Sequence, residues 1–129
     1  MARKSLSALV LALPLALSAA FPAAAHLSPK GQIVRGDATE FTVRYKPGLR
    51  LSDYWCAAGD FVLRDLHALP NAPIWRVSAD RPRPGGGMTF SLSPERAVGY
   101  TGLAVIGNEG GALSAGLADQ MCEVRRRSR

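Results

Sequence analysis

The fold is decided by one helical stretch, residues 52–70, which reads Ser-Asp-Tyr-Trp-Cys-Ala-Ala-Gly-Asp-Phe-Val-Leu-Arg-Asp-Leu-His-Ala-Leu-Pro. Trp55, Val62 and Leu66 recur on one side at helical spacing. This spacing is typical of a helix that packs one face against a core. We therefore expect one principal helix over about 53–69.

Both ends of this helix carry recognisable residue types. Ser52 and Asp53 are good N-caps, and Pro70 cannot continue a helix. Gly59 in the interior costs about 1 kcal/mol relative to alanine, which suggests close approach of a strand or of the Trp55 ring. A second stripe of the same helix holds Cys56, Asp60, Leu63 and His67.

Short alternating segments surround the helix and predict strands. They span residues 32–34, 39–45, 74–79, 88–92, 100–106 and 112–115. A helical turn at 93–95 and a last short helix over 117–124 complete the pattern. The sequence therefore predicts an α+β fold, a small and mostly antiparallel sheet packed on one principal helix, in a single domain over 26–124. The loops Asp80–Gly87 and Gly107–Gly111 are the expected contact surfaces.

The first 25 residues have the organisation of a secretory signal peptide. Arg3 and Lys4 form a basic start, Leu6–Leu17 an apolar run, and Ala23–Ala25 a small-residue cleavage site. Cleavage after Ala25 would place the mature protein in the periplasm or outside the cell, with His26 first. The alternative is an uncleaved N-terminal anchor.

Two cysteines, Cys56 and Cys122, are present in the chain. An even number of cysteines in an exported protein favours a disulfide, so we expect the pair to be bonded. The alternative is a redox or nucleophilic thiol, but the sequence has no Cys-x-x-Cys pair.

The net charge of +6 comes from the two ends of the chain. Arg3 and Lys4 leave with the signal peptide, and the remaining excess lies in a tail expected to be disordered, Arg125, Arg126, Arg127 and Arg129. The body then holds 10 basic and 10 acidic residues. We therefore expect no nucleic-acid partner and, through the tail, at most weak contact with anionic envelope surfaces.

Only His26 and His67 offer imidazoles for chemistry. A mature N-terminal His26 could chelate copper, with His67 as a further ligand. A small hydrolase would have to use His67, supported by an acid such as Asp53, Asp60 or Asp65, although capping and solvated helix positions explain these acids more simply. No cofactor and no catalytic residue is expected from the sequence.

Several motifs resemble a group of small exported proteins of alphaproteobacteria. These motifs are a Tyr-Trp-Cys helix start at 54–56, the strand end Thr89-Phe90-Ser91-Leu92-Ser93-Pro94, and Cys122 near the C-terminus. The resemblance covers about 53–122 and implies export and a disulfide, but no activity. The chain departs from the group at Ser93, where the group tends to have Asp, and in its arginine tail.

The function expected from the sequence is therefore non-catalytic binding or a structural role, toward an unknown protein or envelope partner. The oligomeric state stays open.

Overall fold

The computed structural model of the protein describes residues 25–104 and 109–123. Within these ranges six strands form one sheet in the order β1-β2-β3-β5-β4-β6, and every neighbouring pair is antiparallel. The strands are β1 His26–Leu27, β2 Ile33–Gly36, β3 Phe41–Arg44, β4 Pro73–Arg76, β5 Gly87–Ser91 and β6 Ala112–Ser114. The helices are α1 Leu51–Arg64 and α2 Ala115–Gln120, with single 3-10 turns at Pro94–Arg96 and Glu109–Gly111.

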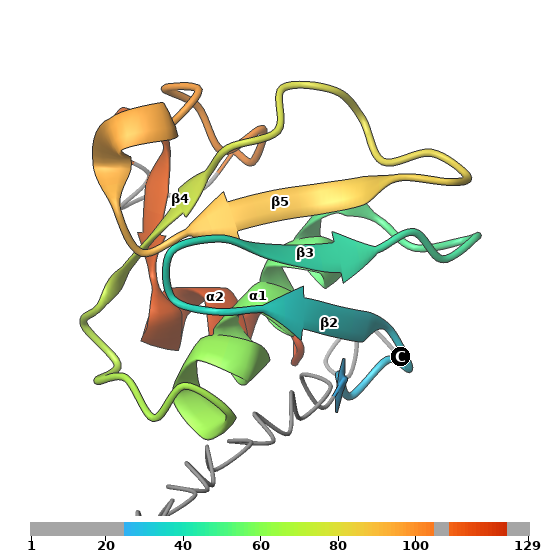
Figure 1. Cartoon of the computed structure of the whole chain (residues 1–129), viewed down its shortest axis with the longest axis horizontal. Helices are drawn as coiled ribbons and strands as arrows, with labels where there is room; N and C mark the ends of the chain where they lie inside the picture. Colours follow the sequence, from blue (N-terminus) through green and yellow to red (C-terminus); the bar gives the residue numbers. More distant parts are fainter. Residues whose placement is uncertain (1–24, 105–108, 124–129) are drawn as a thin grey trace, which may run out of the picture.

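Both helices lie on one side of the sheet, as Figure 1 shows. Apolar side chains that alternate along the strands face the helices and are fully buried; they include Val34, Phe41, Val43, Met88 and Phe90. The Phe41 ring packs on Phe61 of α1, with 4.8 Å between centroids, and Trp55 meets Phe90 at the same distance. The α+β architecture expected from the sequence is confirmed.

The principal helix differs from expectation at both ends. It begins at Leu51, with Arg50 as the N-cap, and Asp53 lies within the first turn, where its Oδ2 accepts the Arg50 N–H at 2.8 Å. The helix ends at Arg64 rather than near Leu69, because His67 adopts a left-handed conformation with φ 54° that reverses the chain before Pro70.

The second helix covers another side of α1, so that residues 53–62 of α1 are all buried. Gly59 is the crossing point. A Cβ there would lie 2.4 Å from the Asp119 nitrogen of α2. The close neighbour of Gly59 is therefore α2, neither a strand nor Trp55. The Cys56–Cys122 disulfide joins the two helical segments and confirms the expected pairing.

Two expected elements change. The last helix spans Ala115–Gln120 instead of 117–124, because Ser114 caps it by accepting the Leu117 N–H at 3.2 Å. Residues 100–104 form no strand. Gly102 has a positive φ of 81°, and the Thr101 carbonyl accepts side-chain donors in place of a strand partner. Residues 105–106 lie outside the described ranges.

Candidate functional site: a tyrosine-walled cavity with a buried arginine

A cavity of about 650 Å³ opens at one end of the molecule. Three segments that are far apart in sequence surround it: the connection from β3 into α1, the end of β4 with the loop after it, and the turn that contains Tyr100 and Gly102. Its lining residues are Tyr45, Leu49, Leu51, Tyr54, Arg76, Ala79, Arg81, Pro82, Tyr100 and Gly102. Three aromatic rings and two guanidinium groups therefore share one hollow.

Arg76 is the polar centre of the cavity wall. It follows Ile74 on the inner face of β4, and the residue is only 3% exposed. Its Nε donates to the Ser78 carbonyl at 2.7 Å, and Nη1 donates to the Thr101 carbonyl at 3.2 Å. Nη2 donates to the carbonyls of Ala79 and Asp80, each at 3.2 Å. This arginine therefore fixes the loop after β4 to the turn at Thr101.

The Arg76 guanidinium is an uncompensated buried cation. In the described ranges its side chain forms no ion pair with a carboxylate. Besides the carbonyl oxygens that it contacts, the guanidinium faces the Tyr100 ring, 5.2 Å from the guanidinium carbon to the ring centroid. Burial lowers the pKa of Arg76 from its usual value. Because guanidinium does not lose its proton in proteins, the wall carries a positive charge in a partly desolvated setting.

Three tyrosine rings line the cavity together with the Arg76 guanidinium. Tyr54 is 2% exposed, and its hydroxyl oxygen accepts the Lys46 N–H at 3.3 Å. Burial raises the pKa of Tyr54 above 10.0, so the phenol is neutral at physiological pH. Tyr100 is 47% exposed and donates its hydroxyl to the Ala79 carbonyl at 3.2 Å. The wall therefore offers apolar rings and hydroxyl groups, but no base.

Gly102 keeps the approach to Arg76 open. A Cβ at this position would lie 2.7 Å from Arg76 Nη1 and 2.6 Å from Leu51 Cδ2. Its φ of 81° also disfavours any other residue. Four of the five guanidinium N–H groups donate to carbonyls. The fifth is on Nη1, beside the glycine.

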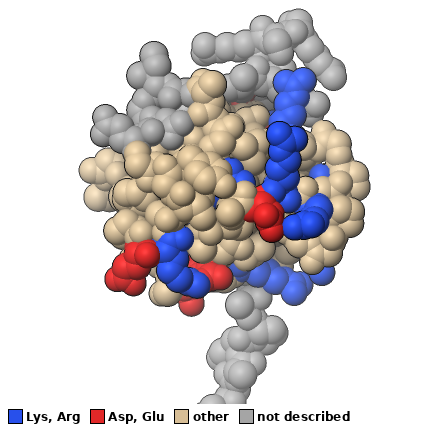
Figure 2. All heavy atoms as spheres, turned by 90° about the horizontal axis from the view of Figure 1, so that it is seen from above, with Lys and Arg blue, Asp and Glu red and all other residues tan. Residues whose placement is uncertain are grey.

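Several cationic side chains, two of them in the cavity wall, form no ion pair in the described ranges. In the described ranges, the lysine and arginine side chains that form ion pairs with carboxylates are those of Lys30, Arg64, Arg83 and Arg96. The others are Arg35, Arg44, Lys46, Arg50, Arg76 and Arg81. Figure 2, seen from above, shows several Lys and Arg side chains on this face, with Asp and Glu side chains beside some of them.

His26 contacts α1 through its imidazole ring. It lies in β1, its Nε2 is 2.5 Å from Asp60 Oδ2, and its ring meets Phe61 edge-on with 5.6 Å between centroids. Asp60 is 4% exposed, so it is a buried ion-pair partner and not the solvated helix position that the sequence suggested. Asp65 is nearly half exposed, with Oδ1 4.0 Å from His26 Nδ1.

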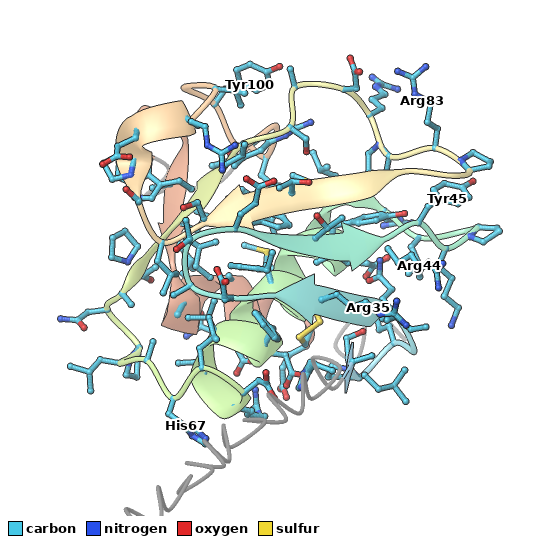
Figure 3. The ribbon with its side chains drawn as sticks, in the orientation of Figure 1. Arg35, Arg44, Tyr45, His67, Arg83 and Tyr100 are labelled. Atoms are coloured by element: carbon cyan, nitrogen blue, oxygen red, sulfur yellow. A yellow bond between two sulfur atoms is a disulfide. The ribbon has the colours of Figure 1, made fainter. Side chains whose placement is uncertain are left out.

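His67 lies apart from this group. Its residue is exposed, and Figure 3 shows its side chain pointing away from the body at the end opposite Tyr100. In the part of the chain that the structure describes, no group of three or more His, Cys, Asp and Glu residues could hold a metal ion. The geometry therefore gives no support to a copper site on His26 and His67, or to a hydrolase centred on His67; both stay predictions.

The expected contact loop Asp80–Gly87 does reach the cavity, through Arg81 and Pro82. The other loop lies only partly in the described ranges, with residues 107–108 outside them. Sequence reasoning missed Tyr45, Arg76 and Tyr100 as site residues. A usable indication was present: Arg76 shares the alternation of Ile74, which places a charged residue on the buried face of a strand.

Comparison with family models, with curated proteins and with solved structures found no match. The tail Arg125, Arg126, Arg127 and Arg129 lies outside the described residues.

Proposed function

We propose that this protein is an exported, non-catalytic binding domain, and that its ligand is a small organic anion with a flat apolar part. The observation that carries this proposal is the buried Arg76, which has no carboxylate partner in the described ranges and stands in a cavity walled by Tyr45, Tyr54 and Tyr100. An anion there would supply the missing counter-charge, and the rings would cover its apolar part.

The residue types in the wall favour binding over catalysis. The lining holds no carboxylate, imidazole or thiol, and its buried phenol is neutral. General acid–base or nucleophilic chemistry needs such a group within hydrogen-bond reach of the substrate. Arg81, exposed at the rim, adds a second positive charge that attracts an anion.

The binding test is an NMR titration of the protein with 4-hydroxybenzoate, compared with the neutral 4-hydroxybenzyl alcohol. We expect saturable shifts at Tyr100 and Gly102 for the carboxylate only. Arg81→Gln should weaken binding about two- to fivefold, as expected for one exposed charge pair. Arg83→Gln, on the same loop but outside the cavity, is the matched control. Equal binding of acid and alcohol, or no saturable shift, would contradict the proposal.

Export is the second part of the proposal. A disulfide-bonded small domain is compatible with an extracellular location, and neither helix in the described ranges is long and apolar enough to cross a membrane. The signal-like residues 1–25 support cleavage after Ala25. Mass spectrometry of the protein produced in a bacterium should find His26 as the first residue; a full-length product in the cytoplasm would contradict export.

A further inference from the structure

A second hollow, distinct from the tyrosine-walled cavity, lies on the sheet face that the helices leave open. Its volume is about 350 Å³, and it is lined by Ile33, Arg35, Thr42, Arg44, Gly85, Gly86, Gly87 and Thr89. These residues come from β2, β3, β5 and the end of the β4–β5 loop. We propose that this hollow, which we call the sheet groove, binds a phosphate group through Arg35 and Arg44.

Strand register brings the two arginines to one side of the sheet. Arg35 pairs with Thr42, and Thr42 pairs with Thr89, so these three side chains form one row across β2, β3 and β5. Arg44 lies two residues further along β3, opposite Gly87. Diagonal neighbours of this kind are about 7–8 Å apart. Figure 3 shows both arginine side chains at the same end of the strands.

This juxtaposition is not compensated within the described part of the protein. Neither Arg35 nor Arg44 contacts a carboxylate there, and like charges on neighbouring strands repel. Glu40, the acidic residue that precedes β3, is instead paired with Arg96. Two guanidinium forks therefore face one hollow without a protein anion between them.

The floor of the hollow suits an oxyanion. The hydroxyl groups of Thr42 and Thr89 share a hydrogen bond of 3.0 Å, which leaves one hydroxyl proton of the pair to donate to a bound oxygen. Gly87 lies close to the backbone of β3. A Cβ at this position would lie 2.2 Å from the Val43 carbonyl oxygen. The absence of a side chain at Gly87 therefore allows β5 to pack closely on β3 beside the hollow.

Phosphate fits this arrangement better than a carboxylate. Each guanidinium fork can engage two oxygens. A carboxylate has two oxygens in one plane, whereas a phosphate monoester presents three terminal oxygens to donors on different sides. The group can come from a soluble phosphate or from a lipid headgroup, and the chemistry of the site is the same for both.

The first experiment titrates the full chain with inorganic phosphate at constant ionic strength, with chloride as the balancing anion, and follows the amides of Gly86, Gly87 and Thr89 by NMR. We expect saturable shifts. The double variant Arg35→Gln/Arg44→Gln should weaken phosphate binding by about tenfold or more, since both charge-assisted donors are lost. The control is Arg83→Gln, which changes an exposed arginine of the β4–β5 loop that does not line the sheet groove. This variant should bind phosphate as tightly as the unaltered protein does.

The second experiment identifies the source of the phosphate group. The same variants are sedimented with vesicles of phosphatidylglycerol and of phosphatidylcholine. Sedimentation with phosphatidylglycerol that is lost in the double variant supports the sheet groove with a lipid headgroup as ligand. Phosphate binding without sedimentation supports it with a soluble phosphate. The arginine tail is present in every variant, so it does not affect the comparison.

Two results would overturn the proposal. One is that neither phosphate nor phosphatidylglycerol binds in a manner that depends on Arg35 and Arg44. The other is that chloride produces the same shifts as phosphate. The double variant is expected to fold, because both side chains are exposed, and its amide spectrum checks this. The outcome is independent of the tyrosine-walled cavity, because the 4-hydroxybenzoate titration reports on different residues.

Discussion

The helix layer and the two hollows differ in how their charged side chains are paired. In the helix layer, carboxylates meet cations: Asp60 contacts both His26 and Arg64, Arg64 also reaches Asp119 at 2.8 Å, and Asp53 pairs with Lys30. Around the two hollows, Arg35, Arg44, Arg76 and Arg81 have no carboxylate partner in the described ranges.

This difference shows that a formally neutral body can still present a positive surface. The ion pairs of the helix layer connect β1 and α2 to α1. In the described part of the chain, the arginines that line the two hollows form no ion pairs between segments. Among them, Arg76 joins two segments, the loop after β4 and the turn at Thr101, through its hydrogen bonds. We therefore expect changes in the helix layer to alter stability, and changes at the hollows to alter binding.

The largest expected effect is removal of the disulfide. Cys56→Ala combined with Cys122→Ala opens a link between residues 66 positions apart. The chain-entropy argument predicts a loss of about 4 kcal/mol in the free energy of unfolding. Urea unfolding measures this loss, and reduction of the unaltered protein should reproduce it. An unchanged midpoint would show that the helix layer does not depend on its covalent link.

Gly59→Ala should come next, although alanine ordinarily favours a helix. The added methyl group would lie 2.4 Å from the Asp119 nitrogen and would push α1 and α2 apart. Overpacking of this kind costs about 1–3 kcal/mol. Gly86→Ala is the control, since the nearest atom to its added Cβ is 3.5 Å away. Thermal unfolding should separate the two variants; equal melting temperatures would contradict the tight crossing.

Asp60→Asn tests the ion pairs of the helix layer. The variant weakens contacts to His26 and Arg64 from a residue that is 4% exposed. Hydrogen bonds to charged groups contribute about 1.5–3 kcal/mol each to stability. Because the neutral amide of asparagine retains part of this contribution, we expect the free energy of unfolding to fall by about 1–2 kcal/mol. Hydrogen exchange should show early opening of β1. Asp65→Asn, at an exposed position, should leave the free energy of unfolding and the hydrogen exchange of β1 unchanged. An effect equal to that of Asp60→Asn would show that the buried ion pairs of the helix layer have no special role in stability.

Tyr54 predicts a pH dependence of stability. Burial raises its folded-state pKa above the ordinary 10.0, so the folded state favours the protonated phenol. That contribution is complete below pH 10 and is lost as the pH rises through the folded-state pKa. Urea unfolding between pH 8 and 11 should therefore show declining stability, with a smaller decline in Tyr54→Phe. Identical pH profiles would rule out this tyrosine as the cause.

The smallest effect on stability is expected at the sheet groove. Arg35→Gln and Arg44→Gln change exposed side chains without carboxylate partners, so each should shift the free energy of unfolding by no more than about 0.5 kcal/mol. Relief of the repulsion between the two charges acts in the opposite direction and offsets part of any loss. A loss of the size expected for Asp60→Asn would mean that the open face also stabilises the fold, and the division between the two regions would fail.

Local patterns in the sequence were sufficient for the architecture. Alternation in 39–45 and 88–92 predicted the central strands β3 and β5, helical spacing predicted α1, and the cysteine count predicted the disulfide. Helix ends were less predictable, because the left-handed turn at His67 uses a residue other than glycine, and such residues seldom have a positive φ.

The candidate sites were not predictable in this way. Asp60 was expected in solvent, yet β1 and Arg64 enclose it, and β1 is 34 residues away in sequence at His26. The tyrosine-walled cavity likewise depends on Tyr45, Arg76 and Tyr100 meeting across three segments. Composition and spacing along one segment do not report such contacts, which follow from strand order.

The shortness of the outer strands has a further consequence for how the protein meets other molecules. The sheet ends in β1, with 2 residues, and β6, with 3 residues, whereas its longest strand, β5, is internal. Few unpaired backbone groups are thus presented at either edge. Extension of the sheet by a strand from another chain, the usual start of edge-to-edge aggregation, has little to build on.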